Sequence, residues 1–396
     1  MDKKMYLSAD VNYILAKLLD SGYEAYVVGG AVRDFLLGDV PGDYDITTSA
    51  EPCEIKEIFK NEKTVDTGIK HGTVSVVLNH KAYEITTYRI DGEYLDARHP
   101  ESVSFTRDIS EDLARRDFTV NAMAYNERSG LVDLFSGEED LKRGIIRAVG
   151  SADKRFEEDA LRILRALRFA SKLDFKIEKN TSLAIFKKAH LLSKVAKERV
   201  YAEWVKLLSG KGAYRIINEY IEVIKIFIPE LNGVFLANEA QFCDADFELR
   251  FVSLFAYKGA GAWEKSLNAL HSDNKIKLLG KTLLENFKEE LSTEYKMKLM
   301  LSKIGEESTE RLIKFKKLCE KTVENEEKLF EKVIKSGACF RLSEMKISGN
   351  ELNNIGITGR KNGEILAKTL DAVMKGEIPN EREALLGFAV KLSENE

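Results

Sequence analysis

This chain of 396 residues has few cysteines and no long apolar run, and each of these absences excludes certain classes of protein. Its four cysteines are scattered and form no Cys-x-x-Cys pair, so we expect neither a zinc site nor a disulfide framework. Because no run of eighteen apolar residues occurs, we expect neither a membrane span nor a secretion signal. These absences favour a cytoplasmic protein.

Charge is abundant but nearly balanced. Charged residues make up 32% of the chain and apolar residues 44%, which is typical of a soluble globular protein. The net charge of −4 argues against an indiscriminate nucleic-acid coat. RNA binding stays possible, because a net value hides local patches and clustered arginines can contact phosphates on an acidic protein.

Sequence character changes near residue 150. Before it, helices are expected near 8–20, 31–37 and 52–60, and strands near 25–28, 43–47, 73–78 and 82–88. Three of the five prolines fall in this part, whereas the rest of the chain is rich in Leu, Ile, Lys, Glu and Ala. Because breakers are rare there, long helices are expected. The pattern predicts a small α/β head followed by an elongated, mostly helical body.

The most informative stretch runs from Tyr26 to Ile46 and reads as a strand, a two-glycine turn, a helix start and a second strand. Gly29 and Gly30 allow a ligand close to the backbone, and the helix that follows offers free N–H groups to phosphate. Asp43 and Asp45, two residues apart on the expected strand, would point to one face and attract Mg²⁺. The combination predicts phosphoryl or nucleotidyl transfer; a plain turn and an ordinary exposed strand are the alternatives.

A second cluster is Glu111-Asp-Leu-Ala-Arg-Arg-Asp-Phe-Thr-Val-Asn-Ala122, read as a helix that passes into an apolar strand. The guanidinium fork of Arg116 suits triphosphate oxygens, and Asn121 could bond a ribose hydroxyl. A charged helix terminus that makes surface ion pairs is the alternative interpretation.

The third cluster, Phe156–Phe169, repeats charge every three residues on what the pattern predicts to be one helix. Asp159 and Arg162 would offer one acceptor and one fork of donors to a planar partner. Adenine and cytosine each carry an amino donor beside a ring-nitrogen acceptor, whereas guanine and uracil present the opposite pattern. Such a pair would therefore select A and C, unless the stripe is only a ladder of ion pairs.

These stretches, followed by Glu198-Arg-Val-Tyr-Ala-Glu203, occur in the order seen in class II tRNA nucleotidyltransferases, the family of bacterial CCA-adding enzymes and poly(A) polymerases. The chain resembles that family over about residues 22–210 and more weakly beyond. The resemblance implies an α+β protein, in which a small nucleotidyltransferase head precedes an elongated, mostly helical neck, body and tail. The implied divisions are 1–148, 149–210, 211–305 and 306–396.

The resemblance also implies roles for single residues. Asp43 and Asp45 would be the catalytic ligands of Mg²⁺, and Asp159 and Arg162 the protein template for the base. The other implied residues either contact the nucleotide, belong to the matching motifs or supply a third carboxylate. They are Gly29, Gly30, Arg33, Glu84, Arg116, Asn121, Glu158, Arg165 and Arg168.

The implied reaction is the addition of CCA to the 3′ end of tRNA from CTP and ATP, without a nucleic-acid template and with release of pyrophosphate. No obligatory protein partner is evident. The intact loop at 88–105 favours an enzyme that adds the terminal A; addition of A alone or poly(A) synthesis is the alternative, and a non-catalytic RNA-binding protein a remote one. Glycine-rich turns near 347–352 and 356–366, with Arg360 and Lys361, could open helices that grip RNA phosphates.

Overall fold

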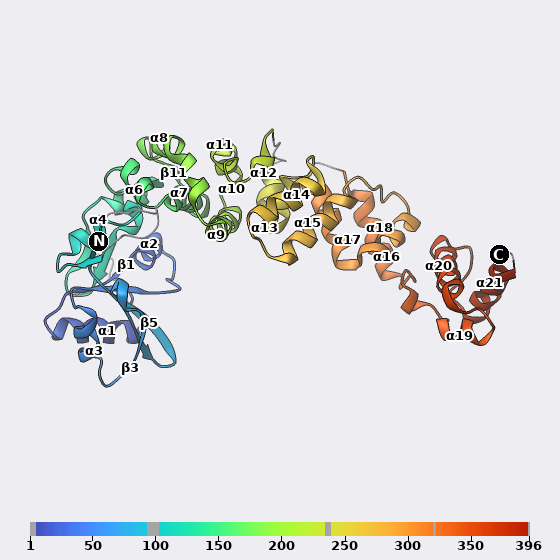
Figure 1. Ribbon diagram of the computed structural model, residues 1–396, viewed down its shortest axis with the longest axis horizontal. Coiled ribbons are helices and arrows are strands. Elements are labelled where there is room, and N and C mark those ends of the chain that lie inside the picture. Colours follow the sequence, from blue (N-terminus) through green and yellow to red (C-terminus); the bar gives the residue numbers. More distant parts are fainter. Residues whose placement is uncertain (1–4, 93–102, 234–238, 320–321, 395–396) are drawn as a thin grey trace. The chain divides into compact units, whose positions relative to one another are not determined.

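The structure is a computed structural model that describes residues 5–92, 103–233, 239–319 and 322–394. The chain divides into two compact units, Met1–Leu231 and Asn232–Glu396, which Figure 1 colours along the sequence. Each unit is described by itself. The finer division into four parts stays a prediction. Among the described residues, no helix is both long and apolar enough to cross a membrane.

A seven-stranded mixed sheet forms the head of the first unit, in the order β3-β4-β5-β2-β1-β8-β9. Neighbours pair antiparallel except β2 and β5, which are parallel. The strands are β1 (Ala25–Val28), β2 (Asp45–Thr48), β3 (Lys63–Gly68), β4 (Thr73–Leu78), β5 (Lys81–Thr87), β8 (Met123–Asn126) and β9 (Gly130–Asp133). The shorter β6 (Arg89–Asp91) and β7 (Val103–Phe105) pair with each other.

In the described part of the head, five α-helices accompany the sheet: α1 (Ala9–Asp20), α2 (Gly30–Leu37), α3 (Pro52–Ile58), α4 (Ile109–Ala114) and α5 (Gly137–Arg143). On one sheet face, Tyr26 and Val28 pack with Tyr88 and Leu113 in a buried cluster. The expected helices and strands of the head are confirmed to within two residues at each end. A hairpin at Asn79 and His80 joins β4 to β5: both residues have positive φ, 46° and 64°, as a two-residue type I′ turn requires.

The helical part of the first unit begins with α6 (Ala152–Glu158), α7 (Leu161–Leu173), α8 (Lys179–Lys188), α9 (Lys197–Leu208), α10 (Ala213–Glu219) and α11 (Ile221–Ile224). The helix α7 packs along α9. Leu164 and Leu167 of α7 are buried, and so is Trp204 of α9. This amphipathic arrangement leaves the arginines of α7 on the opposite side of the helix.

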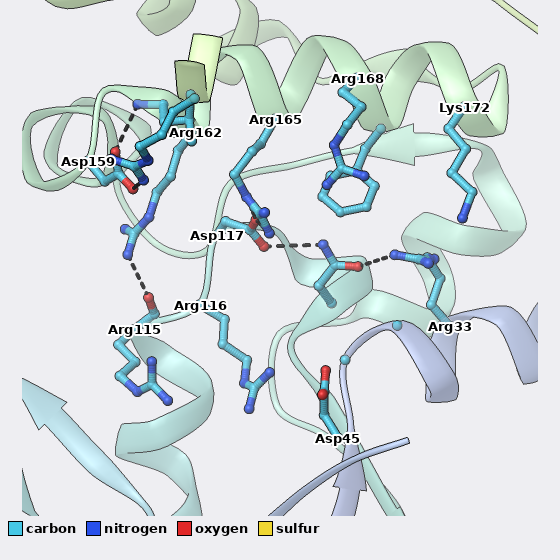
Figure 2. A pocket seen from close by; sticks show the side chains of 16 residues that line it. Arg33, Asp45, Arg115, Arg116, Asp117, Asp159, Arg162, Arg165, Arg168 and Lys172 are labelled. Atoms are coloured by element: carbon cyan, nitrogen blue, oxygen red, sulfur yellow. Dashed lines mark hydrogen bonds and ion pairs between the residues drawn. The ribbon is translucent and has the colours of Figure 1, made fainter. Parts of the chain in front are cut away.

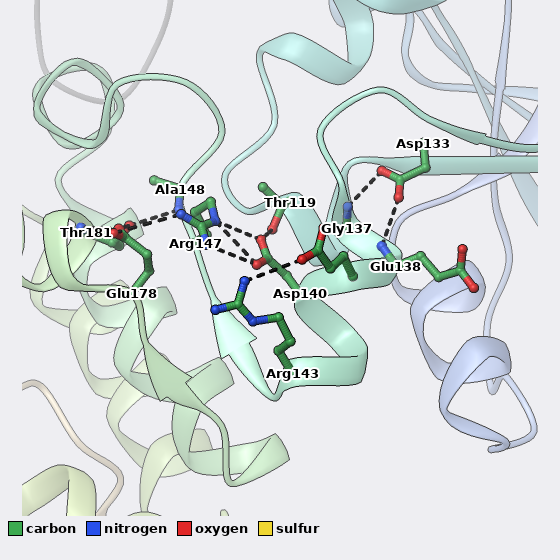
Figure 3. A network of polar contacts seen from close by, with 11 residues as sticks. Thr119, Asp133, Gly137, Glu138, Asp140, Arg143, Arg147, Ala148, Glu178 and Thr181 are labelled. Atoms are coloured by element: carbon green, nitrogen blue, oxygen red, sulfur yellow. Dashed lines mark hydrogen bonds and ion pairs between the residues drawn. The ribbon is translucent and has the colours of Figure 1, made fainter.

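A polar network joins the head to these helices (Figure 3). The carboxylate of Asp140 accepts hydrogen bonds from Thr119 Oγ1 at 2.7 Å and from Arg147 Nε at 3.0 Å. The backbone N–H of Ala148 donates to Thr181 Oγ1 on α8. At Gly137, a Cβ atom would lie 2.3 Å from the carbonyl oxygen of Thr119, so a larger residue would push the elements apart. The network fixes α5 against the segment that carries Asp117.

The second unit is helical throughout its described residues, as the sequence predicts for this part of the chain. It contains α12 (Glu239–Asp244), α13 (Phe247–Ser253), α14 (Gly259–Ala269), α15 (Asn274–Asn286), α16 (Glu294–Ile304), α17 (Glu306–Leu318), α18 (Glu324–Lys335), α19 (Gly349–Asn354), α20 (Gly359–Lys375) and α21 (Arg382–Glu394). At Gly280, a Cβ would lie 2.2 Å from Cε2 of Trp263, so this glycine lets α15 approach α14. The glycine turns near the C-terminus do open helices, α19 and α20.

Two local expectations are wrong. The strand β2 begins at Asp45, so Asp43 lies in the preceding loop and does not alternate with Asp45 along a strand. Asp159 does not continue the helix of Arg162, because α6 ends at Glu158 and Asp159 is extended, with φ −139° and ψ 104°. Its Oδ1 accepts the N–H of Leu161 at 3.0 Å, which satisfies an orphan donor where α7 begins.

Candidate active site

The two-glycine turn lies between β1 and α2 and lets other groups approach the backbone. Gly29 has φ +69°, a conformation in which residues with a Cβ are strained. A Cβ there would also lie 3.3 Å from Nη1 of Arg116. The free N–H groups at the start of α2 therefore face a space that an arginine borders, which suits an anion.

Asp45 is the first residue of β2 and pairs in register with Val28 of β1, so it stands beside the end of the strand that leads into this turn. Its side chain lines the cavity of the site, and among the described residues it has no hydrogen bond or ion pair of its own. Asp43 is exposed and is not among the lining residues. A carboxylate without a protein partner, amid arginines, is available to a cation or to water.

Glu84 lies on β5, the strand next to β2, at the position adjacent to Asp45. The register pairs Ile46 with Ile85, so Asp45 and Glu84 each precede a paired position and lie on one face. Glu84 is exposed and does not line the cavity. Within the described residues, no cluster of three or more His, Cys, Asp or Glu side chains could hold a metal ion. The third carboxylate therefore stays a prediction.

A cavity of about 480 Å³ lies between the head and α7, and Figure 2 shows Asp45, Arg33 and Arg116 on its head side opposite Arg165, Arg168 and Lys172 of α7. Eight of the lining side chains are basic and three acidic, in a protein whose net charge is negative. The lining residues are Gly29, Gly30, Arg33, Asp45, Arg115, Arg116, Asp117, Asn121, Asp159, Leu161, Arg162, Arg165, Arg168, Phe169, Lys172 and Arg199. This concentration of positive charge suits a polyanion such as a triphosphate.

A chain of hydrogen bonds through Asp117 links the two sides of the cavity (Figure 2). Arg165 Nε donates to Asp117 Oδ2 at 2.7 Å, and Asn121 Nδ2 donates to Oδ1 at 3.2 Å. Arg33 Nη1 in turn donates to Asn121 Oδ1 at 2.6 Å. Burial alone would raise the pKa of Asp117, but the positive charge of Arg165 and the bond from Asn121 hold it below its ordinary value. Asp117 is thus an anion that orients two donors.

An ion pair with the buried Asp112 holds Arg116 in position. Its Nη2 lies 3.1 Å from Oδ2 of Asp112, a carboxylate with no exposed surface, while Arg115 binds the other oxygen at 2.7 Å. Burial alone would raise the pKa of Asp112, but the charges of Arg116 and Arg115 lower it. The side chain of Arg116 is 20% exposed, so its remaining N–H groups are available at the cavity.

The two side chains expected to recognise the base are held by different neighbours. Asp159 Oδ2 pairs with Arg199 of α9 at 3.0 Å. Arg162 Nη1 donates to Glu158 at 2.7 Å and its Nη2 donates to the carbonyl oxygen of Arg115 at 3.1 Å. A carboxylate accepts about four hydrogen bonds and a guanidinium donates five, so both groups keep unused capacity toward the cavity. Glu158 acts behind Arg162 and does not itself line the space.

Six lining residues have no role predicted from the sequence: Arg115, Asp117, Leu161, Phe169, Lys172 and Arg199. Arg199 and Glu203 are one turn apart on α9. Arg199 pairs with Asp159, just before α7, and Glu203 Oε2 pairs with Arg168 Nε on α7 at 2.6 Å. Both belong to the Glu198–Glu203 motif, where the i, i+4 spacing of opposite charges was a usable signal. Phe169 has no such signal, because an aromatic residue on an amphipathic helix usually belongs to the core.

Comparison with protein families first defines a class. Residues 25–147 match the model of the poly A polymerase head domain, residues 174–233 that of the probable RNA and SrmB-binding site of polymerase A, and residues 251–389 that of tRNA nucleotidyltransferase domain 2. The head, with its two-glycine turn and arginine-lined cavity, is therefore that of an RNA nucleotidyltransferase.

Whole-chain relatives then identify the family. The CCA-adding enzyme of Leuconostoc mesenteroides is 38% identical over 400 residues, covering 96% of this chain and 95% of that protein. That of Ligilactobacillus salivarius is 54% identical over 209 residues, covering 53% of this chain and 51% of that protein. The chain belongs to the family of CCA-adding enzymes.

Solved structures agree with this assignment and with the α+β fold. The Bacillus stearothermophilus CCA-adding enzyme in complex with CTP has a TM-score of 0.79 and 33% identity, with 97% of both chains covered. The Thermotoga maritima CCA-adding enzyme complexed with tRNA has a TM-score of 0.71 and 25% identity, covering 98% of this chain and 96% of that one. The resemblance stated from the motifs is confirmed.

Proposed function

We propose that this protein extends the 3′ end of tRNA by C, C and A, taking the nucleotides from CTP and ATP without a nucleic-acid template. The observation that carries the proposal is the cavity in which Asp45, an arginine row and the Asp159–Arg162 pair meet. The tRNA 3′-hydroxyl gives up its proton to water and its oxygen bonds to the α-phosphorus, while the bond from that phosphorus to the bridging oxygen breaks and pyrophosphate leaves. Each turnover lengthens the RNA by one residue.

In this proposal the arginines hold the triphosphate. Arg116, Arg165 and Arg168 offer N–H groups to its oxygens, and the start of α2 at Gly30 adds backbone donors. Arg33 is only 4% exposed and bonded to Asn121, so it stiffens the wall on the head side. Because these donors are already oriented by Asp112, Asp117 and Glu203, little reorganisation accompanies binding.

Base selection follows from Asp159 and Arg162. The carboxylate accepts the amino group that adenine and cytosine share, and the guanidinium donates to the adjacent ring nitrogen. Guanine or uracil would place a carbonyl against the carboxylate and an N–H against the guanidinium, leaving buried groups unpaired. Ion pairs hold the two side chains in position: Asp159 pairs with Arg199, and Arg162 pairs with Glu158.

The residues fit a magnesium ion. Asp45 offers carboxylate oxygens without a protein partner among the described residues, and Mg²⁺ commonly uses one or two carboxylates with substrate phosphates and water. Asp45, with Asp43 from the adjacent loop, would hold the ion. When bound, it supplies Lewis-acid activation of the attacking hydroxyl and neutralises charge on the leaving pyrophosphate.

The test uses tRNA transcripts that end before CCA, after the first C and after CC, incubated with Mg²⁺ and labelled CTP or ATP. Incorporation of both nucleotides, with a stop after A, supports the proposal. Label on the CC-ended transcript alone would instead identify an A-adding enzyme, long A tracts a poly(A) polymerase, and absence of label a binding protein.

The loop expected to accompany A addition is described only at its ends, where β6 pairs with β7, since residues 93–102 lie outside the described residues.

Cytoplasmic location is part of the same proposal. Cys53 and Cys339 carry no disulfide, as the reducing cytoplasm would maintain them. Secretion of the active protein would contradict it.

A further inference from the structure

One aromatic ring lies among three of the cavity's arginines. The Cζ atoms of Arg168, Arg33 and Arg165 lie 3.8, 5.2 and 5.5 Å from the ring centroid of Phe169. Arg165 precedes Phe169 by one turn of α7 and Arg168 is its direct neighbour in the sequence, whereas Arg33 comes from α2 in the head. Phe169 is 5% exposed and lines the cavity. The ring therefore contacts cations from both sides of the site.

Three guanidinium groups this close together repel one another when no anion lies between them. An aromatic face attracts a cation within about 6 Å of its centroid, and more strongly where water is excluded. Each arginine also has its own carboxylate: Arg33 pairs with Asp34 and also binds Asn121, Arg165 pairs with Asp117, and Arg168 pairs with Glu203. The ring of Phe169 lies close to all three guanidinium groups, whereas each carboxylate pairs with a different one.

The ring itself is fixed in place. Phe118, fully buried, meets Phe169 in an edge-on contact with centroids 5.8 Å apart and planes at 74°. Phe118 follows Asp117 directly and donates its backbone N–H to that carboxylate. The ring orientation and the Asp117 network are thus set by the same short segment of the head.

We propose that Phe169 is a positioning residue for the incoming triphosphate: its ring, packed against Arg33 of the head wall, holds Arg165 and Arg168 so that their N–H groups face the phosphates. This inference deepens the proposed function and rests on it for the identity of the ligand. Because the ring acts on phosphate-binding groups and not on Asp159 or Arg162, its removal weakens CTP and ATP equally. Base selectivity is expected to stay unchanged.

The test measures binding, without catalysis, in the full-length protein. Inorganic triphosphate, CTP and ATP are titrated calorimetrically at fixed salt with EDTA, so that no divalent metal contributes. Phe169→Leu removes the ring face, Phe169→Tyr retains it, and Phe156→Leu shortens another fully buried phenylalanine that does not line the cavity. Thermal unfolding of each variant is recorded; if Phe169→Leu does not fold, Phe169→Met takes its place.

We expect Phe169→Leu to weaken all three ligands by about tenfold, a factor that partial loss of three cation–π contacts provides. Phe169→Tyr and Phe156→Leu should bind within about twofold of the parent protein. Unchanged binding in Phe169→Leu, equal weakening in Phe156→Leu, or a Tyr variant as weak as Leu would each overturn the proposal. Failure of the function proposed above looks different: the protein would bind triphosphate but transfer no nucleotide to tRNA.

Discussion

Replacing Asp117 by Asn tests the network that joins the head to α7. The substitution keeps the shape of the side chain, and Oδ1 can still accept the N–H of Phe118, at 2.8 Å, and the amide of Asn121. It removes the charge, however, and turns an amide N–H₂ toward Arg165, whose Nε and Nη2 lie 2.7 and 2.6 Å from Oδ2. A donor then faces a donor.

The structure gives the size of the expected loss. Hydrogen bonds to a charged group contribute about 1.5–3 kcal/mol, and breaking a fully buried pair costs more. The Arg165 side chain is 35% exposed, so water replaces part of what it loses, whereas Asp117 is 7% exposed. We therefore expect the free energy of unfolding of the first unit to fall by about 2 kcal/mol at pH 7, a factor of about 30 in the unfolding equilibrium.

The pH dependence of this loss has a definite sign. The pKa of Asp117 lies below its ordinary value in the folded protein, so its charge stabilises the fold above the unfolded-state pKa of about 4. That stabilisation is lost as the pH falls through the lowered pKa. The difference between the parent protein and Asp117→Asn should therefore be full above about pH 5 and shrink progressively below about pH 4.

The assay exploits the distribution of tryptophan. The chain has two, Trp204 in the first unit and Trp263 in the second. In a Trp263→Phe background, urea unfolding followed by fluorescence reports the first unit alone. Asp153→Asn is the control, since Asp153 is 42% exposed where it pairs with Lys187, and should change stability by less than about 0.5 kcal/mol. Equal stability of Asp117→Asn and the parent, or a difference that does not shrink as the pH falls from 5 to 3, would refute the reasoning.

Three further predictions concern catalysis. Asp45→Ala should abolish nucleotide transfer and leave tRNA affinity, measured by filter binding, within about twofold, because this carboxylate serves the chemical step; retained turnover would exclude the metal role. Arg162→Ala should lower incorporation of both CMP and AMP or admit GTP and UTP, so unaltered selectivity in a four-nucleotide competition would remove the template argument. Gly29→Ala should raise KM for CTP about tenfold, since it adds about 1–2 kcal/mol of backbone strain and crowds Arg116, and an unchanged KM would show that the turn tolerates a side chain.

Sequence alone predicts much of the head. The β-branched run Thr73–Leu78 and its partner strand, and the helix after Gly29, follow from local pattern because period and turn chemistry agree there. Ten of the thirteen residues singled out from the sequence line one cavity. Their catalytic and binding roles remain proposals.

Local sequence pattern does not predict the contacts between segments that are distant in the sequence. A repeat of three residues suggests that Asp159 belongs to the helix of Arg162, but the bond from Leu161 to its carboxylate ends one helix and starts the next. Asp43 belongs to a loop because pairing with β1 starts only at Asp45, which no single strand reveals. Phe169 and Arg199 gain their importance from α2 and Asp159, elements distant in sequence.

The interruption at Asp159 constrains how this segment can vary. Successive residues of an α-helix are rotated by about 100°, so one residue inserted inside α7, between Leu161 and Arg162, would turn the arginines that follow away from Asp159. Exchange of one side chain for another leaves that phase intact. The segment from Glu158 to Arg162 should hence accept no change in length.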